Sequence, residues 1–223
     1  MTASLIFDLD GTLIDSLPDV VLAANRLLAG EGRREITLAE GGGMVGEGAR
    51  PLVERAFSTT GAPVEEGRID DLVRRFVALY RAAPAERTIV YPGVEKTLAA
   101  LAADGVPLGI CTNKPHEMSM LVLETMGLAA HFEAVLGGDA LAVKKPDPGH
   151  LDAVLDRLGA TRAGAVYVGD SPVDVEAARN AALPVIAVTY GYSRVPPAAL
   201  GADLLIDRFD ELPGALARLA RVP

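Results

Sequence analysis

Two aspartates stand directly after a short apolar run near the start of the chain. Residues 5–7 have the composition of a strand buried on both faces, and Asp8 and Asp10 follow before Gly11 allows a sharp turn. Side chains two residues apart lie on the same side of an extended backbone, so both carboxylates face one small volume. Two like charges this close need a cation between them or a proton on one of them. The pattern therefore indicates a functional site rather than a surface turn.

Thr112 and Asn113 form a second candidate site, because they follow the apolar residues 108–111 and precede an expected helix. A hydroxyl, an amide and free backbone N–H groups at a helix start can bind phosphate oxygens. An ordinary N-cap explains the same residues equally well.

Lys144 and Lys145 lie in a loop after another expected strand. A lysine pair in a loop is usually solvated, but an acidic site that accepts phosphate needs a cation. Asp170 and Asp174 follow the apolar residues 165–168 and are four residues apart across a turn into a helix. They could share one hard cation such as Mg²⁺, which prefers oxygen ligands. The alternative is an N-cap aspartate followed by an unrelated surface aspartate.

An alternation of strands and helices after residue 93 must position these groups. Repeated strand and helix units predict a mainly parallel sheet covered on both faces, with ligands at the carboxyl ends of the strands. The expected strands are 107–111, 134–136, 165–168, 185–188 and 204–206, and the expected helices are 94–103, 116–126, 149–158, 173–181 and 211–220.

Residues 16–87 interrupt this alternation with helical patterns, including helices at 51–60 and 69–83, and with Gly-rich turns such as 41–43. The interruption predicts a core domain of residues 1–15 and 88–223 with a helical cap domain, 16–87, inserted into it. The Gly-rich segment 41–48 has neither a preceding strand nor a following Lys-Ser/Thr pair, which argues against a P-loop.

Composition limits the function classes. The chain has 223 residues, half of them apolar, and a net charge of -9, which disfavours nucleic-acid and anionic-membrane partners. Its only cysteine, Cys111, cannot form an intrachain disulfide. No secretion signal and no apolar run long enough for a membrane span stand out, so a cytoplasmic location is expected.

The four polar segments together resemble the haloacid dehalogenase superfamily. Asp8-Leu9-Asp10-Gly11-Thr12-Leu13 is similar to its first motif and Thr112-Asn113 to its second, while Lys145-Pro146 and Gly169-Asp170 with Asp174 resemble the remaining two. The resemblance implies an α/β fold with a doubly wound, Rossmann-like parallel sheet and an inserted α-helical cap. Three segments resemble the phosphoglycolate phosphatase branch, namely residues 45–48, 137–139 and 189–192.

The resemblance also implies roles for residues in a Mg²⁺-dependent phosphomonoesterase. Asp8 would be the nucleophile that forms an aspartyl-phosphate, Asp10 the general acid and base, and Lys145 a charge-neutralising catalytic residue. Mg²⁺ would be held by Asp8, the Asp10 carbonyl and Asp170, with Asp174 holding its waters. The substrate-binding residues would be Thr112 and Asn113 at the phosphate. In the expected cap, Arg50 and Arg55 are candidates for holding a substrate carboxylate, and Arg50 is favoured because it lies at a helix start just after residues 46–48.

The best single substrate under this interpretation is 2-phosphoglycolate, a small phosphorylated metabolite. A sugar-phosphate phosphatase or a β-phosphoglucomutase-like phosphotransferase remains the alternative, because such enzymes keep all four motifs. A haloacid dehalogenase is less consistent with the sequence, since the family's dehalogenases lack the second aspartate, present here as Asp10. The intact acidic set argues against a catalytically inactive binding module. The sequence leaves open whether the protein is a monomer or a dimer.

Overall fold

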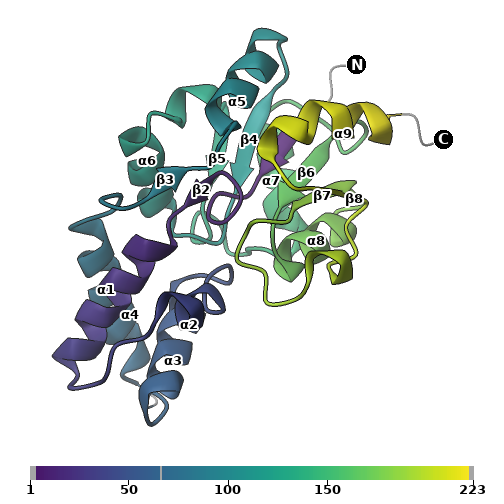
Figure 1. Ribbon diagram of the computed structural model, residues 1–223. Helices are drawn as coiled ribbons and strands as arrows, with labels where there is room; N and C mark the ends of the chain where they lie inside the picture. Colours follow the sequence, from purple (N-terminus) through teal and green to yellow (C-terminus); the bar gives the residue numbers. More distant parts are fainter. Residues whose placement is uncertain (1–3, 66, 221–223) are drawn as a thin grey trace.

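Short apolar runs form one six-stranded parallel sheet in the computed structural model, which describes residues 4–65 and 67–220 (Figure 1). The strand order is β5-β4-β1-β6-β7-β8, so β1 lies inside the sheet between β4 and β6. The strands are β1 (Leu5–Phe7), β4 (Leu108–Cys111), β5 (Ala134–Leu136), β6 (Val166–Gly169), β7 (Val185–Val188) and β8 (Leu204–Ile206). The predicted doubly wound α/β fold is confirmed.

Helices cover both faces of this sheet, and neighbouring residues of β1 face opposite sides. Leu5 and Phe7 belong to a hydrophobic cluster on one face, while Ile6 belongs to the cluster on the other. The first face is covered by α5 (Val94–Ala103), α6 (His116–Thr125) and α9 (Leu212–Leu219), and the second by α7 (Pro148–Arg157) and α8 (Pro172–Asn180). Short 3₁₀ turns are η1 (Ala129–His131), η2 (Pro197–Ala199) and η3 (Phe209–Glu211).

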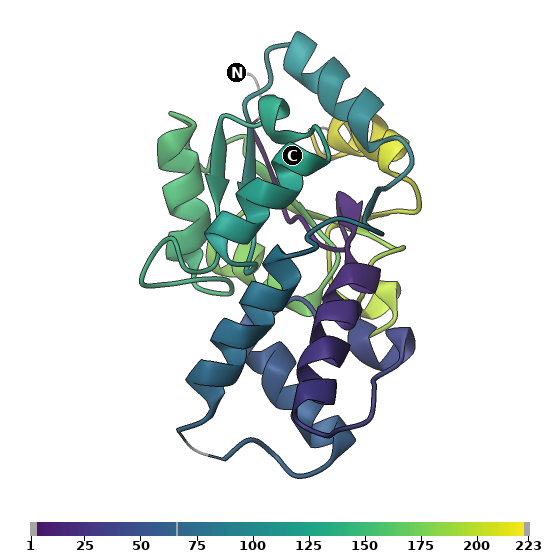
Figure 2. The same ribbon diagram turned by 90° about the vertical axis from the view of Figure 1, so that its left-hand side faces the viewer.

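The other four helices lie together on one side of the sheet and are called the helical block here (Figures 1 and 2). They are α1 (Leu17–Gly30), α2 (Leu38–Gly42), α3 (Ala49–Thr60) and α4 (Ile69–Arg81). Their apolar sides meet in a hydrophobic cluster of their own, to which α6 contributes Met118. This arrangement is consistent with an inserted cap, although the domain boundaries of 16–87 stay a prediction.

A short two-stranded ribbon connects the helical block to the sheet. It pairs β2 (Ile14–Asp15) with β3 (Ile89–Val90) in antiparallel fashion, so the chain leaves and returns at one place. The buried Asp19 fixes this junction, because its carboxylate accepts hydrogen bonds from the N–H and the hydroxyl of Thr88 at 2.8 and 2.7 Å. Among the described residues, no helix is long and apolar enough to cross a membrane.

The predicted turn at glycines 41–43 begins inside a short helix: Gly41 and Gly42 end α2, Gly43 follows as its C-cap, and the Met44 N–H donates to the Gly41 carbonyl at 2.8 Å. A capping box starts this helix: the Glu40 N–H donates to Thr37 Oγ1 and the Thr37 N–H donates to the Glu40 carboxylate. Gly41 is needed for close packing on α1, since a Cβ atom there would lie 2.3 Å from a methyl group of Val21. Glycine at these positions therefore serves both the close packing on α1 and the turn at the end of α2.

Candidate active site

Asp8 lies at the carboxyl end of β1, as expected, and is almost completely buried. Its N–H donates to the Val168 carbonyl at 2.9 Å, which extends the sheet pairing by one residue. Gly11 then turns the chain with a φ of 84°. A Cβ atom at Gly11 would lie 2.6 Å from a carboxylate oxygen of Asp170, so glycine permits the loops after β1 and β6 to approach.

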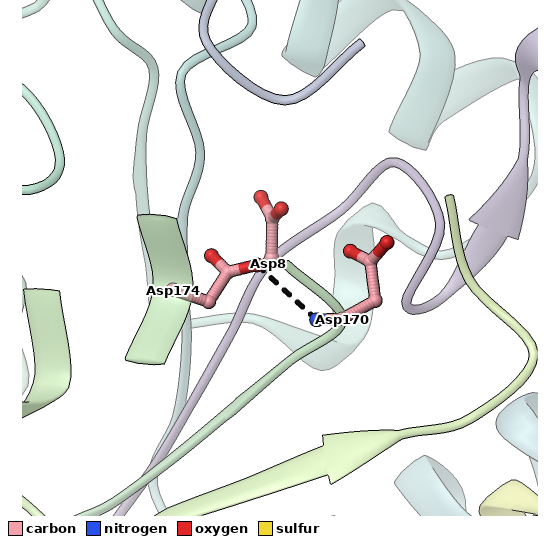
Figure 3. A group of neighbouring side chains, drawn as sticks. All are labelled: Asp8, Asp170 and Asp174. Carbon is pink, nitrogen blue, oxygen red and sulfur yellow. Dashed lines mark hydrogen bonds between the residues drawn. The ribbon is translucent and has the colours of Figure 1, made fainter. Parts of the chain in front are cut away.

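Three buried aspartates meet at this edge of the sheet. Asp8 from the end of β1, Asp170 from the end of β6 and Asp174 from α8 have carboxylate oxygens within 4.8 Å of one another (Figure 3). The Asp170 N–H donates to Asp174 Oδ2 at 3.1 Å. The structure therefore brings Asp8 together with Asp170 and Asp174, two aspartates from the distant second half of the sequence.

Both carboxylate oxygens of Asp174 are occupied by protein donors. Oδ1 accepts hydrogen bonds from Lys145 Nζ at 2.7 Å and from the Tyr167 hydroxyl at 2.9 Å. Oδ2 accepts from the Ser171 N–H at 3.0 Å and the Ser171 hydroxyl at 2.6 Å, in addition to the Asp170 N–H. A carboxylate with this many donors is better suited to holding neighbouring groups than to binding an ion directly.

Lys145 is the buried cation of this cluster. Its ammonium nitrogen lies 2.9 Å from Asp8 Oδ1 and donates hydrogen bonds to Asp174 and to the Tyr167 hydroxyl, the latter at 2.7 Å. The contact with Asp8 is an ion pair without hydrogen-bond alignment, so Asp8 Oδ1 has no hydrogen-bond donor among the described residues. One oxygen of Asp8 is thus electrostatically stabilised but not engaged in a hydrogen bond.

Burial makes this cluster electrostatically unusual. Desolvation raises the pKa of Asp8 to about 7, opposed by the charge of Lys145 and reinforced by Asp174. Desolvation and repulsion from Asp174 and Asp8 also raise the pKa of Asp170 well above its ordinary value. Burial acts in the same direction on Asp174, but Lys145 and the hydrogen bonds to its carboxylate lower its pKa. Three carboxylates share one buried ammonium group, and an added hard cation would offset the remaining repulsion.

Thr112 and Asn113 follow β4 and lie beside Asp8 at the same cavity. Thr112 is buried, and its Oγ1 accepts the N–H of Lys114 at 3.2 Å. The Asn113 amide nitrogen donates to the carbonyls of Gly46 and Lys145 at 3.2 and 3.1 Å. Because Gly46 precedes α3, Asn113 joins the sheet loops to the helical block, while its Oδ1 is buried without a donor among the described residues.

Lys114 is a site residue that the sequence analysis missed. Its buried ammonium nitrogen lies 2.9 and 3.2 Å from the two carboxylate oxygens of Asp10 and donates to the Tyr80 hydroxyl at 2.7 Å. Burial lowers the pKa of Lys114, but Asp10 and Tyr80 more than offset this and raise it above its ordinary value. The sequence does contain one signal for it, because Lys114 is the third polar residue in a row after the apolar residues 108–111.

Asp10 has a second donor and faces the same cavity as Asp8. The Ser16 hydroxyl donates to Asp10 Oδ1 at 2.5 Å, on the side of the chain that leads into α1. Asp10 is therefore held between a hydroxyl and the ammonium group of Lys114.

The loop after β7 completes the surroundings of Asp170. The Tyr192 N–H donates to Asp170 Oδ2 at 2.7 Å, and the Thr12 hydroxyl donates to Oδ1 at 3.2 Å. The Tyr192 hydroxyl also donates to Asp15 at 2.6 Å. The sequence marked residues 189–192 without giving them a role, and the structure shows that Tyr192 of this segment hydrogen-bonds a site carboxylate.

Arg50 does not reach this site. Its half-exposed side chain lies on α3, where it forms ion pairs with Asp70 of α4 and with Glu54. It is absent from the residues that line the cavity beside Asp8. In this structure the packing of α3 on α4 turns this side chain towards solvent, and a contact between Arg50 and the substrate stays a prediction.

The cavity beside Asp8 is small, with a volume of about 50 Å³. It lies between the helical block and the loops after β1 and β4. Its lining residues are Asp8, Asp10, Val20, Val45, Gly46, Gly48, Ala49, Leu52, Phe76, Val77, Tyr80, Thr112, Asn113, Lys114, Pro115 and Met118. The polar residues gather at the sheet end and the apolar residues come mainly from the helical block.

Residues 5–188, which include every strand-end group described above, match the haloacid dehalogenase-like hydrolase family. The chain belongs to this family. Its relatives include a phosphoglycolate phosphatase of Rhodospirillum rubrum, which is 46% identical over 95% of this chain and 90% of its own length. The resemblance inferred from the motifs is confirmed, as is membership of a group that contains phosphoglycolate phosphatases.

Solved structures of the haloacid dehalogenase-like family have the same fold. A protein of Haemophilus somnus, described as a predicted phosphoglycolate phosphatase, superposes with a TM-score of 0.90 at 30% identity and covers 96% of this chain and 97% of its own. CbbY of Rhodobacter sphaeroides, solved in complex with xylulose-1,5-bisphosphate, gives a TM-score of 0.80 at 25% identity, covering 95% of this chain and 96% of its own. Both likenesses include the helical block.

Proposed function

We propose that this protein is a Mg²⁺-dependent phosphomonoesterase that hydrolyses 2-phosphoglycolate to glycolate and phosphate through an aspartyl-phosphate. The observation that carries the proposal is the state of Asp8: a buried carboxylate with one oxygen that receives no hydrogen bond from residues 4–65 and 67–220, beside Lys145 and facing a cavity shared with Asp10. The names of the relatives support the same activity.

The donor set around Asp8 fits a magnesium ion. Carboxylate and carbonyl oxygens are the ligands that Mg²⁺ prefers, and few of them are needed because the ion retains waters. Asp8, Asp170 and the Asp10 carbonyl would hold the ion, while Asp174 keeps Lys145 and the loop after β6 in place. When bound, the ion supplies charge that reduces repulsion between Asp8 and the phosphate.

Asp8 begins the reaction by attacking phosphorus, which forms the aspartyl-phosphate and breaks the bond to the ester oxygen. Asp10 donates a proton to that oxygen as the alcohol leaves. Asp10 then removes a proton from the water that attacks phosphorus and releases phosphate from Asp8. Ser16 and Lys114 hold the Asp10 carboxylate at the cavity during both steps.

Lys145, Thr112 and Asn113 would stabilise the oxygens of the transferring phosphoryl group. Lys145 provides the positive charge, and Thr112 provides a hydroxyl at the cavity wall. The Asn113 side-chain nitrogen already bonds two carbonyls, so its contribution would come from positioning the loops and from its backbone.

The size of the cavity favours a small substrate over a sugar phosphate. One water-sized volume is about 10–15 Å³, so a cavity of about 50 Å³ holds roughly three to five of them, and the helical block would have to move further to admit a sugar phosphate than to admit 2-phosphoglycolate. The relative solved with xylulose-1,5-bisphosphate keeps a sugar-phosphate phosphatase as the second candidate. A phosphotransferase would differ in passing the phosphoryl group to a sugar rather than to water.

A panel of phosphorylated metabolites tests this proposal. Purified protein with Mg²⁺ should hydrolyse 2-phosphoglycolate with a higher kcat/KM than hexose phosphates, pentose bisphosphates or amino-sugar phosphates. A higher kcat/KM for any of these sugar phosphates would favour the second candidate, a sugar-phosphate phosphatase.

Residues 16–87 would act as the cap that closes over the substrate. A cytoplasmic location stays a prediction.

A further inference from the structure

The cavity beside Asp8 has a mainly apolar wall that no step of the proposed reaction explains. Apart from the phosphate end, its lining side chains are mostly hydrocarbon and come from the helical block and α6: Val20, Val45, Leu52, Phe76, Val77 and Met118. Lys114 is the one cation among the described lining residues. A ligand that carries a carboxylate in addition to its phosphate would meet this one ammonium group, which it would share with Asp10.

Lys114 is held in place from both sides of the cavity. On the sheet side, its ammonium nitrogen contacts both carboxylate oxygens of Asp10. On the side of the helical block, it donates to the hydroxyl of Tyr80 and lies 4.5 Å from the centre of the Tyr80 ring. These contacts fix the ammonium group at the cavity wall, so little conformational freedom is left to lose when a ligand binds.

The position of Lys114 next to Asp10 matters because Asp10 protonates the ester oxygen. In 2-phosphoglycolate, the carboxyl carbon is only two bonds from that oxygen. A group that binds the carboxylate must therefore lie beside Asp10, and Lys114 Nζ is 2.9 Å from its Oδ1. Arg50, the cation expected from the sequence, is half-exposed and paired with Asp70.

We propose that Lys114 binds the carboxylate of the leaving group and selects small phosphorylated acids over uncharged alkyl phosphates. This inference rests on the phosphatase function proposed above. The Tyr80 hydroxyl orients the ammonium group, and the hydrocarbon side chains of the apolar wall cannot form hydrogen bonds with the hydroxyl groups of a sugar. Specificity then arises from one charge-assisted contact and from the small cavity.

Two substrates with the same carbon skeleton isolate the contact. 2-Phosphoglycolate carries the carboxylate, whereas ethyl phosphate has a methyl group in its place. The Lys114→Met variant keeps the length of the side chain but removes its charge. We expect it to lower the ratio of kcat/KM for 2-phosphoglycolate to kcat/KM for ethyl phosphate by roughly 10- to 100-fold, the scale of one hydrogen bond to a charged group. The matched control is Lys96→Met on the exposed surface of α5, which should leave the ratio unchanged.

The ratio of the two kcat/KM values shows whether Lys114 binds the substrate or only positions Asp10. If Lys114 served only to position Asp10, both substrates would lose activity equally and the unchanged ratio would overturn the proposal. Lys114→Gln gives a second variant that can still bond Tyr80, and its ratio should fall in the same way. An unmutated enzyme that hydrolyses ethyl phosphate but not 2-phosphoglycolate would instead disprove the proposed function.

Inhibition of the unmutated protein provides a measurement that needs no variant. Glycolate should inhibit hydrolysis of ethyl phosphate at a concentration at least about 10-fold lower than ethylene glycol does, because only glycolate carries the charge. Equal inhibition by the two compounds would contradict a carboxylate site at Lys114.

Discussion

Lys145 Nζ lies 2.9 Å from Asp8 Oδ1, an oxygen that receives no hydrogen bond from any described residue. The ammonium group favours the ionised form of Asp8 without occupying that oxygen in a directed hydrogen bond. A nucleophile requires this combination, because its lone pairs must stay available while its charge is stabilised. The neighbouring Asp174 keeps Lys145 in place through a hydrogen bond of 2.7 Å.

Asp8→Asn should lower kcat/KM for 2-phosphoglycolate by at least about 1,000-fold, since an amide is not a nucleophile for phosphorus. The side chain keeps its size, so far-ultraviolet circular dichroism should be unchanged. Steady-state phosphate release measures the loss. A kcat/KM within 10-fold of that of the unmutated protein would show that Asp8 is not the nucleophile.

The effect of Asp10→Asn on the reaction rate should depend on the leaving group of the substrate. Loss of the proton donor should slow hydrolysis of an alkyl phosphate by about 100-fold or more, which is the contribution typical of general acid catalysis. Formation of the aspartyl-phosphate from 4-nitrophenyl phosphate should be affected much less, because its leaving group needs little protonation. Pre-steady-state release of 4-nitrophenol measures that step. Equal slowing of both substrates would argue against the acid role.

Asp174→Ala should destabilise the protein by about 3–5 kcal/mol, because it removes the carboxylate that accepts a hydrogen bond from the buried Lys145 and leaves the ion pair with Asp8 as the remaining charge partner of Lys145. Urea unfolding followed by circular dichroism measures the free energy of unfolding. The control is Asp152→Ala, which removes a solvent-exposed ion pair with Arg162 and should change stability little. Similar losses in the two variants would mean that the buried network has no special role.

Removal of metal should affect stability through Asp170. At a concentration about 100 times its Kd, Mg²⁺ stabilises a folded protein by about 2.7 kcal/mol, which corresponds to a Tm increase of roughly 5–10 °C for a chain of this size. Asp170→Asn should abolish most of this increase, and EDTA should reverse it in the unmutated protein. If Mg²⁺ raised the Tm of Asp170→Asn as much as it raises the Tm of the unmutated protein, the ion would have to bind at other residues.

The sequence predicted the sheet and its acidic residues because both depend on local patterns. A buried apolar run followed by a polar residue marks a strand end, and Asp8, Thr112 and Asp170 all follow this rule. The strands at 134–136, 185–188 and 204–206 and the helix at 94–103 have the bounds expected. Most other predicted elements differ by one or two residues at their ends, where hydrogen bonding rather than composition sets the boundary.

Residues whose role depends on helix packing could not be predicted in this way. Tyr80 contacts Lys114 only because α4 packs against α1 and brings its last turn to the cavity. Arg50 turns outward because α4 offers it Asp70. Neither relationship has a signature in the local sequence, since the rotation of a helix is set by its partners.

We expect Asp8 to carry the phosphoryl group during turnover of 2-phosphoglycolate. Acid quenching within milliseconds of mixing with ³²P-labelled substrate and Mg²⁺ should trap an aspartyl-phosphate, followed by peptide mapping to locate the label. The label is expected on the peptide that contains Asp8, and none is expected in Asp8→Asn. Release of labelled phosphate at the normal rate with no label on that peptide, under conditions that preserve acyl phosphates, would contradict the mechanism.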